Sequence, residues 1–225
     1  MDIVDFHSHI LPGADHGSTS IETSLGQLRL AGSNGVQRIV ATPHFYPHRD
    51  SVERFILRRS KCFDDLRAHM TDDCPSVRLG AEVLVCNNIN NLPGLEQLCI
   101  AGSRILLLEL PFNDFSYHYV DTVEQIIRDG YRVVLAHADR YPEENIEKML
   151  YCGAKIQLNA DSLATLFKKK HLYRWMERGK VVALGSDIHG DDAAAYKKFV
   201  VAQKKMGEYL PLVKSASDEM WSEFK

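Results

Sequence analysis

The sequence predicts an α/β fold built from repeated strand–helix units, arranged as a barrel or as a doubly wound sheet. Seven short aliphatic runs alternate with longer amphipathic segments, and several runs are apolar nearly throughout, as parallel strands covered on both faces are. Gly130, Gly153 and Gly179 each stand just past an expected helix and just before an expected strand. The length of 225 residues suits a single domain spanning 1–225.

The expected strands are short and rich in valine, isoleucine and leucine. They cover 3–6, 38–42, 77–83, 104–110, 132–137, 155–160 and 180–187. Between the third and fourth of these, the asparagine-rich segment 84–102 favours turns before any helix.

The expected helices have start and stop signals. Thr19 with Glu22 forms a capping box, and glycines end that helix at 32–35. Asp50 with Glu53 predicts the start of the second helix in the same way. The remaining helices are expected over 119–128, 142–151, 162–177 and 192–206.

Composition excludes several classes of protein. The formal net charge of −3 argues against a nucleic-acid or membrane-surface protein. No run approaches the roughly 20 apolar residues that a membrane span needs. The five cysteines are odd in number and form no CxxC pair, which is typical of reduced thiols. With no signal peptide apparent, we expect a cytoplasmic protein without membrane insertion.

Polar residues collect where the expected strands end. Six of the ten histidines lie at or just beyond these ends, together with three carboxylates. Carboxylates that follow aliphatic strands need a charge partner or a cation. One such residue alone would be read as a hydrogen-bonded core group, but the ends of parallel strands converge on one mouth. The candidate metal ligands are His7, His9, His16, His44, Glu82, Glu109, His137, Asp187 and His189.

Nine candidate ligands exceed the three or four protein ligands of one zinc site and therefore predict two or three ions. Clustered ions are a common device for phosphoester hydrolysis. Mixed imidazole and carboxylate ligands suit manganese, iron or zinc. A cysteine-nucleophile phosphatase is excluded, because no cysteine is followed by five residues and then arginine.

The ordered motifs HSH, ATPH, GAE, LELP, AHxxRY, QLNAxSL and SDxHG resemble the polymerase-and-histidinol-phosphatase (PHP) superfamily. Within it, the chain is similar to the bacterial CpsB/YwqE-type protein-tyrosine phosphatases, over about residues 1–190. The resemblance implies a distorted (β/α)7 TIM-like barrel with three divalent ions, for which we expect manganese, with iron and zinc as alternatives. Arg140 matches an arginine that resembles a phosphate clamp, which makes it the catalytic and substrate-binding candidate.

By matching motif positions, the resemblance divides the ligands into three sets. The first is His7, His9, Glu82 and Asp187, the second is Glu82, Glu109 and His137, and the third is His16, His44 and His189.

The function that the resemblance implies is hydrolysis of phosphotyrosine on proteins through a metal-activated hydroxide. The expected partner is a tyrosine-phosphorylated protein such as a bacterial tyrosine kinase, in exopolysaccharide regulation, with no nucleic acid involved. Two alternatives stay open: a small-molecule phosphatase such as a histidinol-phosphatase, and a non-catalytic metal-bound regulatory module.

Three positions depart from the family pattern. His16 stands where these phosphatases usually have a second aspartate, and Ala138-Asp139 replaces Pro-Glu. The arginine that some members carry shortly after SDxH is missing, and Lys197 and Lys198 follow later. A change in substrate affinity or preference is the expected consequence.

Overall fold

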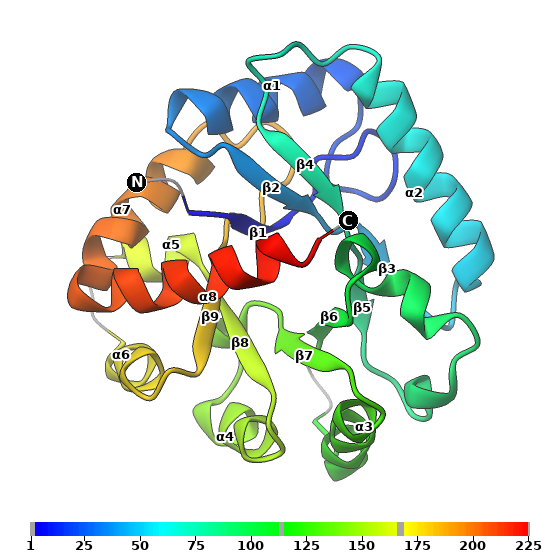
Figure 1. Ribbon diagram of the computed structural model, residues 1–225, viewed down its shortest axis with the longest axis vertical. Coiled ribbons are helices and arrows are strands. Elements are labelled where there is room, and N and C mark those ends of the chain that lie inside the picture. The colour runs from blue at the N-terminus through cyan, green and yellow to red at the C-terminus, as the bar shows by residue number, and fades with distance from the viewer. Residues whose placement is uncertain (1–2, 113–114, 166–168, 225) are drawn as a thin grey trace.

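The structure, a computed structural model, describes residues 3–112, 115–165 and 169–224. It confirms the α/β prediction. Nine strands form one sheet in the order β3-β5-β6-β7-β8-β9-β1-β2-β4, and every paired ladder is parallel. The sheet curls so that its strands surround a common centre, with most helices on the outside (Figure 1).

The strands lie close to their expected positions. They are β1 (Asp5–Ser8), β2 (Arg38–Ala41), β3 (His44–Phe45), β4 (Ser76–Leu79), β5 (Glu82–Leu84), β6 (Ile105–Glu109), β7 (Arg132–Leu135), β8 (Lys155–Asn159) and β9 (Val181–Gly185). The expected strand 77–83 is divided into β4 and β5 at Gly80 and Ala81. Opposite this break, Pro43 separates β2 from β3, because proline has no N–H for the ladder.

The helices are more numerous than expected. They are α1 (Ile21–Ser33), α2 (Val52–Arg67), α3 (Tyr117–Arg128), α4 (Glu143–Tyr151), α5 (Ala160–Ala164), α6 (Lys170–Glu177), α7 (Ala195–Met206) and α8 (Leu210–Ser222). After Leu84, which ends β5, segment 84–102 contains only short 3-10 turns, Ile89–Asn91, Leu95–Leu98 and Ile100–Gly102. The expected helix 162–177 is two helices, α5 and α6; residues 166–168 of that expectation lie outside the described residues.

The predicted capping positions are wrong by one residue. The hydroxyl of Ser20, not Thr19, accepts from the Thr23 amide at 3.1 Å and begins α1. Ser51 caps α2 instead of Asp50. Each serine has an extended backbone, and its short side chain reaches the amide three residues on, as an N-cap requires.

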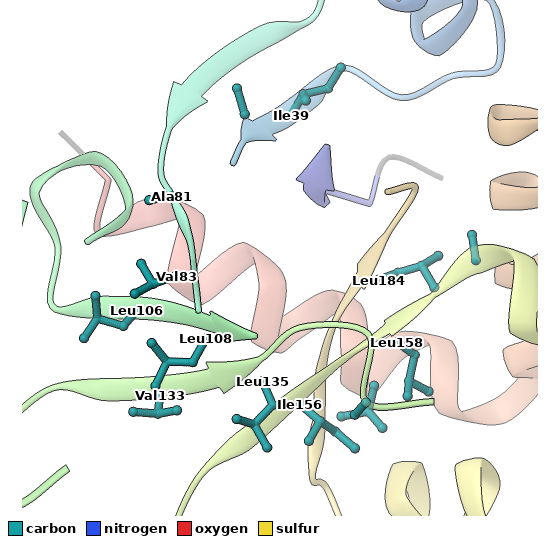
Figure 2. Packing of buried hydrophobic residues seen from close by; sticks show 14 of the residues in the cluster. Ile39, Ala81, Val83, Leu106, Leu108, Val133, Leu135, Ile156, Leu158 and Leu184 are labelled. Atoms are coloured by element: carbon teal, nitrogen blue, oxygen red, sulfur yellow. The ribbon is translucent and has the colours of Figure 1, made fainter. Parts of the chain in front are cut away.

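The apolar residues form two layers. The larger cluster lies between the sheet and the helices, and Figure 2 shows side chains from neighbouring strands that contribute to it. On β6, Leu106 and Leu108 belong to this outer cluster, whereas Ile105 and Leu107 belong to a smaller inner cluster. This alternation follows from the two-residue period of a strand.

Helix α8 crosses one end of the curled sheet (Figure 1). Met220 and the following Phe224 enter the inner cluster. The Ser217 hydroxyl donates to the Val182 carbonyl at 2.9 Å, close to the start of β9. The helix therefore closes the amino ends of the strands, which gives the C-terminal segment a structural role. No helix in the parts of the chain that the structure describes is both long and apolar enough to cross a membrane.

Candidate metal centre

The candidate ligands lie in or after six strands, β1, β3, β5, β6, β7 and β9. His7 is in β1, His44 and Glu82 begin β3 and β5, and Glu109 ends β6. The others follow β1, β7 or β9 within a few residues, except His16, which is farther along the loop after β1; they are His9, His16, His137, Asp187 and His189. The ends of these parallel strands meet at one mouth, so residues far apart in sequence become neighbours.

One group surrounds the Glu82 carboxylate on the β1 side. The Nε2 atoms of His7 and His9 are 3.1 Å apart, and each is 3.3 Å from Glu82 Oε2. Asp187 Oδ1 is 3.6 Å from His7 Nε2 and 3.4 Å from His9 Nε2. These four side chains are the first set that the resemblance implies.

A second group lies on the other side of Glu82. His137 Nε2 is 2.7 Å from Glu82 Oε1 and 3.7 Å from Glu109 Oε1. His44 Nδ1 is 2.8 Å from Glu82 Oε2 and 3.8 Å from Glu109 Oε2. Glu82 therefore lies between the two groups: its Oε2 faces His7, His9 and His44, and its Oε1 faces His137.

The remaining histidines stack above these groups. The His16 ring is stacked on His44 and on His189, with centroids 4.9 Å and 4.8 Å apart. His9 and His189 stack at 4.1 Å. Ligand atoms of His9, His44 and His189 lie within 4.8 Å of one another, and so do those of His44, Glu82 and Glu109. His44 is thus shared between two groups.

Several polar atoms of this cluster are buried without a hydrogen-bond partner among the described residues. They are His44 Nδ1, Glu82 Oε2, His137 Nδ1 and His189 Nε2; the first two lie 2.8 Å apart but outside hydrogen-bond geometry. Buried polar atoms are almost always paired, and each orphan costs about 1–3 kcal/mol. Imidazole nitrogens and carboxylate oxygens around one space are the donor set of divalent transition metals, so these residues fit metal ions.

The two glutamates have opposite pKa shifts. Burial disfavours the charged form of Glu82, but the His7 charge and the neighbouring imidazoles of His137 and His44 outweigh it and hold its pKa well below the usual range. Burial, and then the Glu82 charge, raise the pKa of Glu109 to about 8. Divalent cations would allow both carboxylates to be charged.

Asp15 supports the cluster and was not among the predicted site residues. Its Oδ2 is 2.7 Å from His9 Nδ1 and accepts from the His44 amide at 3.0 Å. Its Oδ1 accepts from the Gly17 amide. A carboxylate on the second nitrogen of a ligand histidine orients the ring. In the sequence, only the position of Asp15 directly before His16 indicated that it could belong to the site.

Arg140 lies beside the cluster. Its Nη2 is 2.6 Å from Asp187 Oδ2, and 40% of its side chain is exposed. It borders a polar cavity of about 200 Å³ that opens next to two candidate ligands. The lining residues are Arg140, Asp161, Ser186, Asp187, His189, Asp192, Ala195 and Lys198.

Aromatic rings stand at the edge of the cluster. Phe112 is 55% exposed and stacks on His137 with centroids 5.6 Å apart. Tyr46 stacks on His44 at 5.2 Å, and the Arg49 guanidinium lies over the Tyr46 ring. Phe45, which precedes Tyr46 in the sequence, is instead buried against α2. No motif in the sequence indicates that Phe112 lies beside the candidate ligands.

Comparison with known proteins gives consistent relatives. Tyrosine-protein phosphatase YwqE of Bacillus subtilis is 28% identical over 97% of this chain and 91% of its own length. Tyrosine-protein phosphatase CpsB of Streptococcus pneumoniae is 26% identical, with 85% and 84% covered. Crystal structures of YwqE and CpsB, metal-dependent tyrosine phosphatases, include a chain with the same fold at a TM-score of 0.80. That chain is 20% identical, and the alignment covers 99% of this chain and 96% of that one.

The sequence model of one family covers all of the site described above. It matches residues 3–210 and is described as capsular polysaccharide synthesis, CpsB/CapC. This range contains every candidate ligand from His7 to His189. The chain belongs to the CpsB/CapC family.

Proposed function

We propose that the protein is a metal-dependent phosphatase that hydrolyses phosphotyrosine on proteins. The observation that carries this proposal is the buried cluster of histidines and carboxylates with orphaned atoms, beside the half-exposed Arg140. The relatives named tyrosine-protein phosphatases support the substrate class. The capsular polysaccharide family supports a role in exopolysaccharide regulation, with a tyrosine-phosphorylated protein such as a bacterial tyrosine kinase as partner.

Three divalent ions, with manganese as the first candidate, would occupy the cluster. His7, His9, Glu82 and Asp187 would hold one, and Glu82, Glu109 and His137 a second. His16, His44 and His189 would hold the third, with His44 placed to reach the second as well. Bound divalent ions lower the pKa of water and neutralise charge on phosphoryl oxygens.

The side chains around the cluster would bind the two parts of the substrate. Arg140 would donate to the phosphoryl oxygens from the edge of the cavity, where Lys198 adds a second positive charge. The exposed Phe112 ring would stack on the tyrosyl ring of the substrate. Phenolate leaves readily, so this assignment requires no strong general acid.

We further propose that the curled sheet is a distorted (β/α)7 barrel within a single domain spanning 1–225. The β2–β4 and β3–β5 ladders have the same offset between paired residues. The consecutive strands β2 and β3 therefore behave as one interrupted strand, and so do β4 and β5. Counted in this way, the sheet has seven strand positions. The five free cysteines agree with a cytoplasmic location.

The test is hydrolysis of a phosphotyrosine peptide by metal-stripped protein refilled with manganese, with histidinol phosphate assayed in parallel. We expect fast turnover of the peptide that a chelator abolishes. Turnover of histidinol phosphate alone would replace the proposal with a small-molecule phosphatase. Metal binding without turnover of either ester would indicate a non-catalytic module.

A further inference from the structure

Strand β8 contributes two buried amide side chains to the centre, although it contributes no candidate ligand. Gln157 and Asn159 are 0% and 1% exposed. They lie two residues apart and therefore on the same face of the strand, while Ile156 and Leu158 between and before them belong to the outer apolar cluster. The two amides thus face the inside of the curled sheet, among the ends of β1, β7 and β9.

The two amide side chains connect three candidate ligands through a continuous series of hydrogen bonds. Gln157 Oε1 accepts from the His137 backbone amide at 2.7 Å and lies 3.0 Å from His7 Nδ1. Gln157 Nε2 donates to Asn159 Oδ1 at 2.9 Å. Asn159 Nδ2 in turn donates to Asp187 Oδ2 at 2.9 Å.

The backbone amide of His137 determines which atoms donate and which accept in this series of hydrogen bonds. A backbone N–H can only donate, so the atom of Gln157 that faces it must be the carbonyl oxygen. That oxygen can only accept from His7 Nδ1, which must therefore carry the proton. The Nε2 lone pair of His7 is then free to face Glu82 and Asp187.

The same direction selects one oxygen of Asp187. Asn159 accepts from Gln157 through its oxygen, so its NH2 group is turned toward Asp187 Oδ2. Arg140 Nη2 donates to this same oxygen. Oδ1 remains for the cluster, at 3.6 Å and 3.4 Å from the Nε2 atoms of the neighbouring histidines.

We infer that Gln157 and Asn159 are positioning residues that fix the tautomer of His7 and the ligating oxygen of Asp187. This inference rests on the proposed metal centre. Loss of a residue that hydrogen-bonds to a metal ligand and orients it typically weakens metal binding about 10- to 100-fold. Gly185 keeps the space for them, because a Cβ there would lie 2.6 Å from Gln157 Nε2.

The first experiment measures zinc affinity of metal-free protein by competition with a chelating indicator. We expect Gln157→Met and Asn159→Leu to weaken binding about 10- to 100-fold. Gln203→Met is the matched control, since Gln203 is a buried glutamine on α7. Gln157→Glu keeps one acceptor oxygen toward His7 and His137 but loses the donor to Asn159, so its affinity should lie between that of the unmodified protein and that of Gln157→Met.

If Gln157 only stabilised the fold, the order of zinc affinities would differ: the buried charge of Gln157→Glu would lower the affinity more than Gln157→Met does. That order, or equal affinities of Gln157→Met and Gln203→Met, would overturn the inference. Peptide hydrolysis is measured separately, so failure of the proposed phosphatase activity does not decide this result.

A second measurement uses the unmodified chain and does not depend on how the variants fold. In zinc-loaded protein with 15N-labelled histidine, long-range proton–nitrogen spectra report which ring nitrogen carries the proton. We expect His7 to show a protected proton on Nδ1. A proton on Nε2 would contradict the inference directly.

Discussion

Glu82 is the residue around which the candidate centre is arranged. It is 1% exposed, and its two oxygens face different histidines. A carboxylate in this position, with an orphaned oxygen, suits a bridge between two cations better than a single hydrogen bond. Arg140, Lys198 and Phe112 lie farther out, where each can be changed without removing a candidate ligand.

Changing Arg140→Ala should lower kcat for a phosphotyrosine peptide about 100- to 1,000-fold, because a pre-organised charged donor to the phosphoryl group is lost. Steady-state kinetics measures the effect. Manganese affinity, determined in parallel, should change far less than kcat. A loss of activity that higher metal concentrations restore would show that Arg140 acts only through its ion pair with Asp187.

Changing Lys198→Ala should raise KM about 2- to 5-fold and leave kcat nearly unchanged, since a half-exposed charge is screened by solvent. The exposed neighbour Lys197→Ala is the matched control and should have no effect. The KM difference between the two variants should shrink as salt is added. Equal KM values at low salt would remove Lys198 from the binding site.

Changing Phe112→Ala should raise KM for a phosphotyrosine peptide about 2- to 10-fold, the loss expected for one aromatic pair. A non-aromatic phosphate ester should be hydrolysed as before, because it has no ring to stack. Tyr151→Ala removes another exposed aromatic side chain, on α4, and serves as the control. An equal effect on both esters would assign Phe112 to the support of His137 instead.

At the scale of the elements, the positions of the candidate ligands depend on how the strands end. The breaks at Pro43 and at Gly80 place His44 and Glu82 at the first residue of a resumed strand. After β7 and β9, His137 and Asp187 have left-handed backbones with φ of 33° and 51°. Such conformations are costly for residues other than glycine and are typical of functional sites.

At the opposite end of the sheet, α8 acts as a lid on the inner apolar cluster. Phe224, just beyond this helix, packs on Phe6 with centroids 6.1 Å apart. Phe224→Ala should lower the free energy of unfolding by about 3 kcal/mol. Leu212→Ala changes an exposed residue of the same helix and is the control. Urea unfolding measures both; equal midpoints would show that the end of the chain does not contribute to the core.

At the scale of the whole molecule, the two ends of the curled sheet differ. One is closed by apolar packing under α8, and the other gathers charged and imidazole groups from six strand positions. The outer helices pack on the sheet through a single large cluster. Ions bound at the polar end would connect strands that are distant in sequence, so metal binding and folding should be coupled.

Metal removal should therefore destabilise the entire protein. With free manganese at about 1,000 times its dissociation constant, the metal-loaded form should be about 4 kcal/mol more stable than the stripped form. Thermal unfolding with and without a chelator measures this, and re-addition of manganese should restore the higher transition temperature. An unfolding temperature that does not depend on manganese would contradict a metal site that forms only in the folded chain.

The strand–helix alternation and the candidate ligands could be predicted from the sequence. Hydrophobic periodicity is a local property, so it can be read along the chain. His7, Glu109 and Asp187 follow or end apolar runs, and the convergence of parallel strand ends made their meeting predictable. The predicted N-cap residues of α1 and α2 were one position too early, because neighbouring polar residues compete for the same amide.

Which side chains meet across the sheet could not be predicted from the sequence and follows from the three-dimensional arrangement. The contact of Asp15 with His9, the sharing of His44 between groups and the amide chain through Gln157 depend on strand register and on the curl of the sheet. The closure by α8 depends on packing against strand starts far away in sequence. These contacts join residues that are distant in the sequence, and no local pattern indicates that they meet. Each strand and most helices, in contrast, have a hydrophobic pattern within their own residues.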